Sequence, residues 1–130
     1  DQRGSLKEGV KVFYRDIPVG EVYGFELSSD ARRTLIHINI EPRYATLVRR
    51  NTRFWNSSGV AINFGLFTGT TIRSKSVESL LEGGIAFATP EGRGEDGLAP
   101  PAEANQHFPL HADVEPSWLR WAPAIPLGDE

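Results

Sequence analysis

Residues 10–22 read VKVFYRDIPVGEV, and this stretch decides the fold class. Alternate large side chains from Val10 to Tyr14 lie on one face of the chain, a period of two that is typical of a strand with one buried face. Residues 16–18 include a proline and form a turn. Residues 19–27 continue the extended pattern. The sequence therefore predicts two successive strands joined by a short turn.

The same alternation recurs further along the chain. Residues 35–40 place Ile36, Ile38 and Ile40 on one face, which we assign to the core, and His37 on the opposite face. Shorter strand patterns occupy residues 52–55, 70–74 and 85–89. Many short strands with glycine-marked turns are typical of a small antiparallel β-barrel or sandwich, so we expect an all-β fold.

Two brief helices are expected between these strands. Pro42 suits a first helical position, and the apolar stripe from Tyr44 to Val48 predicts a helix of about two turns. Ser76 as a capping residue and Gly83-Gly84 as a stop signal predict a second short helix.

Length and composition indicate one domain followed by a tail. A chain of 130 residues is long enough for one core, and a net charge of −3 with scattered basic residues argues against nucleic-acid binding. The absence of cysteine excludes disulfides and thiolate metal sites. Residues 91–106, rich in glycine, proline and acidic side chains, predict a flexible linker. Residues 107–130 then form a C-terminal tail that packs on the domain or on a neighbour.

Catalytic and metal-binding patterns are weak. The potential metal ligands nearest to one another are His107, His111, Asp113 and Glu115. In an extended segment the two histidines stand roughly 13 Å apart, too far to share an ion. No motif positions a nucleophile, an acid or a base. We therefore expect no metal, no cofactor and no enzymatic activity.

Trp118 and Trp121 stand in a proline-spaced stretch, residues 118–127, where the prolines exclude regular helix. Aromatic side chains between prolines commonly fix a tail to its own domain or to a neighbour, and this is the interpretation we favour. The alternative is that the two tryptophans stack on a ligand, which would make the chain a monomeric β-barrel module that binds carbohydrate or peptide.

Residues 58–69, SGVAINFGLFTG, combine glycines with large apolar side chains and carry no charge. Loops bounded by glycine are ordinarily polar. Leu66 and Phe67 are adjacent, so in an extended chain they point to opposite sides and one core has difficulty burying both. On residue pattern alone, a buried hairpin and an apolar contact surface explain the stretch equally well.

The order of three motifs resembles the mammalian cell entry (MCE) domain, in the multi-domain branch of the paraquat-inducible protein B type. The motifs are GSLKEGVKVFYRDIPVGEV at residues 4–22, NTRFWNSSGV at 51–60 and SLLEGGIAF at 79–87. The resemblance covers residues 4–90, which it identifies as the domain, and the tail is similar to segments that join successive domains in that branch.

This resemblance implies a small antiparallel β-barrel of the MCE type that assembles into hexameric rings. Stacked rings form a tube across the periplasm of a Gram-negative bacterium, with the full-length protein anchored in the inner membrane beside partner proteins. The tube carries phospholipids or similar hydrophobic molecules between the inner and outer membranes. By the same resemblance, residues 59–69 line the central pore. The residues expected to contact lipid are Val60, Ile62, Phe64, Leu66 and Phe67.

Overall fold

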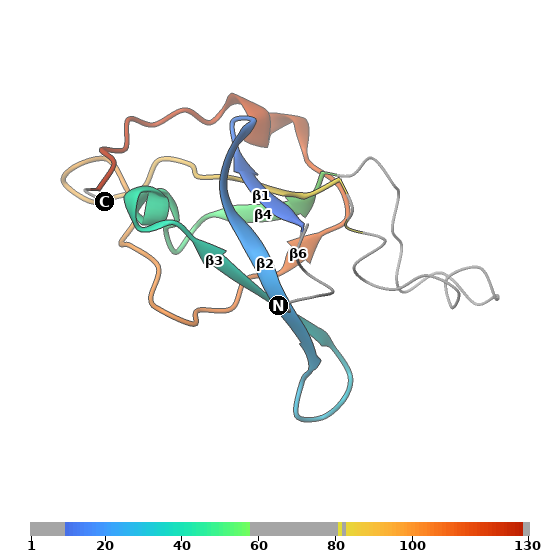
Figure 1. Ribbon diagram of the computed structural model, residues 1–130. Helices are drawn as coiled ribbons and strands as arrows, with labels where there is room; N and C mark the ends of the chain where they lie inside the picture. Colours follow the sequence, from blue (N-terminus) through green and yellow to red (C-terminus); the bar gives the residue numbers. More distant parts are fainter. Residues whose placement is uncertain (1–9, 58–80, 82, 129–130) are drawn as a thin grey trace.

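The computed structural model describes residues 10–57, 81 and 83–128. Their strands form one curved mixed sheet (Figure 1). The strands are β1 (Lys11–Tyr14), β2 (Ile17–Leu27), β3 (Thr34–Ile40), β4 (Arg53–Asn56), β5 (Ile85–Ala88) and β6 (Leu110–His111). Two 3₁₀ helices accompany them, η2 (Pro42–Leu47) and η4 (Pro116–Arg120). The order of strands in the sheet is β3-β2-β1-β5-β4-β6. The all-β fold expected from the sequence is confirmed.

The sheet is mixed, whereas the sequence pattern suggested antiparallel pairing throughout. β1–β2, β2–β3 and β4–β5 pair antiparallel, but β1–β5 and β4–β6 pair parallel. The two parallel pairs join strands that are distant in the sequence, and such partners are not specified by the local period of two.

A turn joins the first two strands as expected, but it lies at Arg15 and Asp16 rather than at residues 16–18, since Ile17 and Pro18 belong to β2. Both residues have positive φ, 51° and 71°, as a two-residue hairpin turn with the twist of the flanking strands requires. The turn brings Tyr14 opposite Ile17. It therefore leaves Ile17 at the end of the hairpin, where the side chain is 53% exposed.

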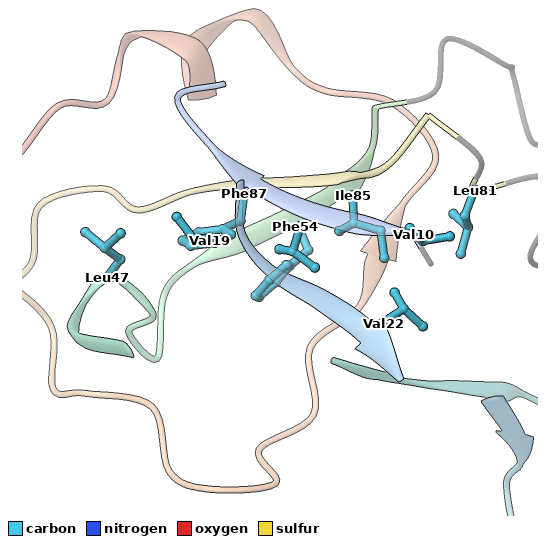
Figure 2. Packing of buried hydrophobic residues seen from close by; sticks show 9 residues of the cluster. Val10, Val19, Val22, Leu47, Phe54, Leu81, Ile85 and Phe87 are labelled. Atoms are coloured by element: carbon cyan, nitrogen blue, oxygen red, sulfur yellow. The ribbon is translucent and has the colours of Figure 1, made fainter. Parts of the chain in front are cut away.

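The main core lies on one face of the sheet, where side chains from β1, β2, β4 and β5 converge (Figure 2). Its buried members are Val10, Val12, Val19, Val22, Leu47, Phe54, Leu81, Ile85 and Phe87. Ile36, Ile38 and Ile40 pack against this cluster, which confirms the face assigned to them from the sequence.

β4 and β5 are covered on both faces. Phe54 and Phe87 point into the main core, whereas Trp55 and Ala88 belong to a second cluster on the other face. The alternation follows from the period of two along a strand. Trp118, from the tail, completes the second cluster and lies 5.7 Å from Trp55 between ring centroids.

The first predicted helix begins at Pro42 as expected, but it is a 3₁₀ helix, η2, that ends at Leu47, and Val48 is extended. Neighbouring parts of the chain supply donors to the carbonyl groups at its end. The Leu47 carbonyl accepts from the Thr89 hydroxyl (2.8 Å), and the Val48 carbonyl accepts from the Ala102 N–H (3.0 Å). These contacts satisfy the terminal carbonyls without a further helical turn. Most of the second predicted helix lies outside the described residues.

Residues 91–106 pack beside η2. Leu98 is 3% exposed, the Arg49 Nη1 donates to the Ala99 carbonyl (3.1 Å), and the Arg50 N–H donates to the Pro100 carbonyl (3.0 Å). These bonds attach the segment to residues 48–50. The division of the chain into domain, linker and tail stays a prediction.

The expectation of no regular helix in residues 118–127 was wrong for the first three residues, which belong to η4. Pro116 stands in the first turn of η4, where a proline costs no hydrogen bond, and Trp121 ends the helix in an extended conformation. From residue 122 to residue 128, where the described part of the tail ends, the chain has no regular secondary structure. It returns to η2, where the Gly128 N–H donates to the Arg43 carbonyl (2.9 Å).

Candidate functional site

The residues that the sequence identifies as lipid contacts lie outside the described residues. They are Val60, Ile62, Phe64, Leu66 and Phe67. Their roles therefore stay predictions. The structure does describe the two strands between which this part of the chain is inserted, β4 before it and β5 after it.

β4 and β5 form an antiparallel pair, and residues 58–80 connect the end of β4 to the start of β5 in the sequence. The last residue pair of the ladder joins Asn56 to Ile85. One step beyond it, the Ser57 N–H donates to the Gly84 carbonyl (2.9 Å), and the Ser57 hydroxyl donates to the Gly83 carbonyl (3.4 Å). We call residues 56–57, 81 and 83–85 the stem. Because of these bonds, the two chain ends that flank residues 58–80 are neighbours.

Two residues of the stem are fixed by the interior of the domain. Leu81 is 1% exposed and belongs to the main core (Figure 2). Gly84 has φ +109°, and a β-carbon placed on it would lie 2.6 Å from Cε2 of Phe13 and 3.1 Å from the Lys11 carbonyl oxygen. Only glycine fits this conformation beside β1 without displacement. The stem is thus held rigidly against the sheet.

A buried hydrogen-bond chain holds the other end of the β4–β5 pair. The Arg49 N–H donates to the Thr52 hydroxyl (2.8 Å), which pairs with the Thr89 hydroxyl (2.7 Å), and Thr89 donates to the Leu47 carbonyl (2.8 Å). Thr52 is 2% exposed and Thr89 is fully buried. Since the Thr89 hydroxyl donates to the Leu47 carbonyl, the Thr52 hydroxyl must donate to Thr89. Both hydroxyl groups therefore donate one hydrogen bond and accept one.

A groove of about 690 Å³ opens beside the β1–β2 turn. The tail forms one wall and η2 forms another. We call it the C-terminal groove, and its lining includes Tyr14, Arg15, Ile17, Tyr44, Ile125 and Leu127. The sequence pattern did not predict this groove. Its only signals were the apolar residues that alternate with prolines in the tail, and these are equally typical of simple packing.

Burial and Arg15 act in opposite directions on Tyr14, which lines the C-terminal groove. Burial raises the pKa of the phenol, and the Arg15 charge opposes that effect by lowering it. Within the described part of the chain, the Tyr14 side chain contacts the Phe87 ring, with 5.1 Å between centroids, and no hydrogen bond to its hydroxyl is formed.

The tryptophans of the tail pack in the second cluster. Trp118 is 6% exposed, and Trp121 lies 6.1 Å from it between ring centroids. His111 approaches Trp118 edge-on at 5.0 Å. A sugar platform needs an open aromatic face, and Trp118 does not offer one.

His107, His111, Asp113 and Glu115 do not gather into a metal site. Among the described residues, no group of three or more histidine, cysteine, aspartate or glutamate side chains is arranged to hold an ion. Within the same residues, no helix combines the length and apolar character of a membrane span.

Comparison with known proteins identifies the family. The family model for the MlaD protein matches residues 1–83. The chain is 39% identical over 125 residues to the lipophilic envelope-spanning tunnel protein B of Escherichia coli (strain K12), an alignment that covers 96% of this chain and 14% of that protein. It is 43% identical over 117 residues to a probable intermembrane transport protein of Haemophilus influenzae (strain ATCC 51907 / DSM 11121 / KW20 / Rd), covering 90% of this chain and 13% of that protein.

The chain thus corresponds to a small part of each relative, 14% and 13% of their lengths. The family model covers more than half of the chain and includes β1 to β4 and the whole of residues 58–80. This protein therefore belongs to the MlaD family, the family of the mammalian cell entry domain.

Proposed function

We propose that this chain is a non-enzymatic lipid-transport module, one MCE ring of a periplasm-spanning tube in a Gram-negative bacterium. In this proposal the tube carries phospholipids or similar hydrophobic molecules between the inner and outer membranes. Residues 59–69 line its central pore, and sister domains and inner-membrane proteins complete the assembly.

The family and the names of two relatives support this proposal. One relative is named an envelope-spanning tunnel protein and the other a probable intermembrane transport protein, and both align with at least 90% of this chain. Neither name describes an enzyme. The observation that carries the proposal is the family match, because it includes the uncharged apolar stretch at residues 58–69 that was singled out from the sequence.

The geometry of the stem is compatible with a pore lining. The described residues on either side of residues 58–80, Ser57 and Leu81, lie at one end of the β4–β5 pair, and Leu81 and Gly84 fix that end to the core. An insertion that leaves and re-enters a domain at one point leaves the core of the domain intact. A ring of such domains would repeat the same short insertion around its axis.

The chemistry required of a conduit is simple. Each CH₂ group that moves from water into apolar surroundings gains about 0.8 kcal/mol, so an acyl chain needs a continuous apolar path to cross an aqueous space. Side chains such as Leu66 and Phe67 offer contacts without directional hydrogen bonds, and a lipid can slide along them. Passive conduction of this kind needs no catalytic group.

The alternative, a monomeric module that binds carbohydrate or peptide through Trp118 and Trp121, is disfavoured by the structure. Trp118 is enclosed by Trp55, His111 and Trp121, so its ring faces are occupied by the protein itself. The tail aromatics therefore act in packing, which is the interpretation that the sequence favoured.

Polar substitution of the predicted pore residues tests the proposal. We expect the double variant Leu66→Asn/Phe67→Asn to keep the far-ultraviolet circular dichroism and tryptophan fluorescence of the unaltered protein, while lipid passage between the membranes of the native bacterium falls. A matched control is Leu119→Asn, since Leu119 is 62% exposed and lies in η4. Unfolding of the double variant would support a buried hairpin instead, and unchanged lipid passage in a folded variant would contradict the conduit.

A further inference from the structure

The C-terminal groove lies toward the opposite end of the β1–β5 pair from the stem. β1 and β5 run parallel, with Val12 beside Ile85 near the stem and Tyr14 beside Phe87 toward the groove. In Figure 1 the tail returns past η2. A ligand in this groove would therefore contact residues that are distinct from the predicted pore lining.

The groove is open to solvent and is lined mainly by apolar side chains. Its volume of about 690 Å³ falls in the range of roughly 300–1,000 Å³ that small-molecule sites occupy. Ile17 and Leu127 line it and are 53% and 41% exposed, so aliphatic surface that could be covered by a ligand is left in water. Tyr44 and Ile125 add further apolar walls.

The lining of the groove carries a single positive charge. Arg15 is the only charged residue among the lining residues that the structure describes. Its positive φ, 51°, belongs to the hairpin turn beside the groove. The adjacent Tyr14 offers a phenolic hydroxyl as a donor, since within the described residues that hydroxyl has no hydrogen-bond partner. The guanidinium of Arg15 and the phenol of Tyr14, on adjacent residues that line an aliphatic groove, match an anionic oxygen group that carries a hydrocarbon chain.

We propose that the C-terminal groove binds a phospholipid by one acyl chain, with the lipid phosphate held by Arg15 and Tyr14. The chain lies along Ile17 and Leu127 and covers their exposed surface. This inference rests on the proposed lipid-transport function for its ligand, but it uses different residues. It makes the module a carrier of lipid on an outer surface as well as the lining of a pore.

Binding of a soluble single-chain probe to the 130-residue chain tests the inference. The probe is dodecyl phosphate below its critical micelle concentration, with dodecyl maltoside as an uncharged probe of the same chain length and inorganic phosphate as a headgroup without a chain. Affinity is measured by calorimetry, and the site is located by amide chemical-shift changes. We expect dodecyl phosphate to shift the resonances of residues that line the groove, and inorganic phosphate to leave them unchanged.

Four variants separate the chain contact from the headgroup contact. We expect Ile17→Glu to weaken both dodecyl probes by at least about tenfold, since it places a carboxylate against the hydrocarbon. Arg15→Gln weakens dodecyl phosphate by about tenfold and leaves dodecyl maltoside unchanged, because only the charge-assisted bond is lost. The matched controls Leu119→Glu and Arg32→Gln alter an exposed leucine and an exposed arginine outside the groove and leave both affinities unchanged.

The inference is overturned if Leu119→Glu weakens binding as much as Ile17→Glu, or if Arg15→Gln and Arg32→Gln are indistinguishable. Displacement of dodecyl phosphate by inorganic phosphate at equal concentration would also overturn it, because the site would then recognise an anion alone. Absence of binding in the groove, with lipid still captured by residues 60–67, refutes the groove and leaves the conduit standing. Binding in the groove without capture by those residues refutes the conduit alone.

Discussion

Alanine at Gly84 tests how the stem is fixed, because two separate costs meet at this residue. The backbone has φ +109°, a conformation that costs a residue with a side chain about 1–3 kcal/mol. The new methyl carbon would lie 2.6 Å from Cε2 of Phe13, whereas carbon atoms in contact prefer about 3.5–4.0 Å. Overpacking of this kind costs a further 1–3 kcal/mol, approximately. We expect Gly84→Ala to lower the free energy of unfolding by about 2–6 kcal/mol in total.

Urea unfolding followed by tryptophan fluorescence measures the effect, since Trp55 and Trp118 are both buried. Gly97→Ala is the matched control. Gly97 has φ +80°, and a β-carbon placed on it would have no atom within 4 Å, so only the backbone cost of about 1 kcal/mol applies.

A double-mutant cycle with Phe13→Ala isolates the steric part. In that background Gly84→Ala costs about 1–2 kcal/mol less, while the close approach to the Lys11 carbonyl persists. Equal costs for Gly84→Ala and Gly97→Ala, or a cycle without coupling between Gly84 and Phe13, would refute the steric explanation.

Three further predictions concern the buried network, the tail and the groove. Thr89→Val lowers the unfolding free energy by about 1–3 kcal/mol, because two buried partners lose their hydrogen bonds. The control Thr34→Val, at an exposed strand position, changes it by less than about 0.5 kcal/mol, and chemical denaturation measures both values. Trp118→Ala costs about 3–5 kcal/mol and Leu119→Ala less than about 0.5 kcal/mol; equal costs would contradict a packing role for the tail. Because burial raises the pKa of Tyr14, the folded state retains the phenolic proton to higher pH than the unfolded state does. The contribution of Tyr14 to the unfolding free energy is therefore fully present below about pH 10 and decreases as the pH rises further. A Tyr14→Phe variant with the same alkaline stability profile would contradict this.

The sequence predicted those parts of the fold that depend on local periodicity. The succession of β1 and β2 and the core face of Ile36, Ile38 and Ile40 follow from alternation, whereas the turn between the two strands was predicted one residue too late. The parallel partners of β1 and β4 could not, because nothing in a strand's own pattern specifies which distant strand lies beside it.

Tertiary contacts decided the elements that the pattern described wrongly. The apolar stripe in residues 42–48 is compatible with an α-helix, but Thr89 and Ala102 supply donors to the carbonyls of Leu47 and Val48, and the helix stops there. The C-terminal groove also arises from tertiary structure, since it joins the β1–β2 turn to a tail more than a hundred residues away in the chain. No local motif could have identified it.

The residues of the candidate site could not be identified from local periodicity alone. Val60, Ile62, Phe64, Leu66 and Phe67 were chosen by an apolar pattern together with a family resemblance, and the family is now shown. Their contact with lipid stays a prediction, because those residues lie outside the described part of the chain.

Capture of lipid by the predicted pore residues is the most direct test of the proposed conduit. A photo-crosslinking amino acid is introduced singly at Leu66 and Phe67, with Leu119 as an exposed control position, in the protein expressed in its native bacterium. After irradiation, lipid bound to the purified protein is measured by mass spectrometry. We expect phospholipid adducts at Leu66 or Phe67 and none at Leu119. No adduct at any position from 60 to 67, in a protein that is folded and correctly localised, would contradict the conduit.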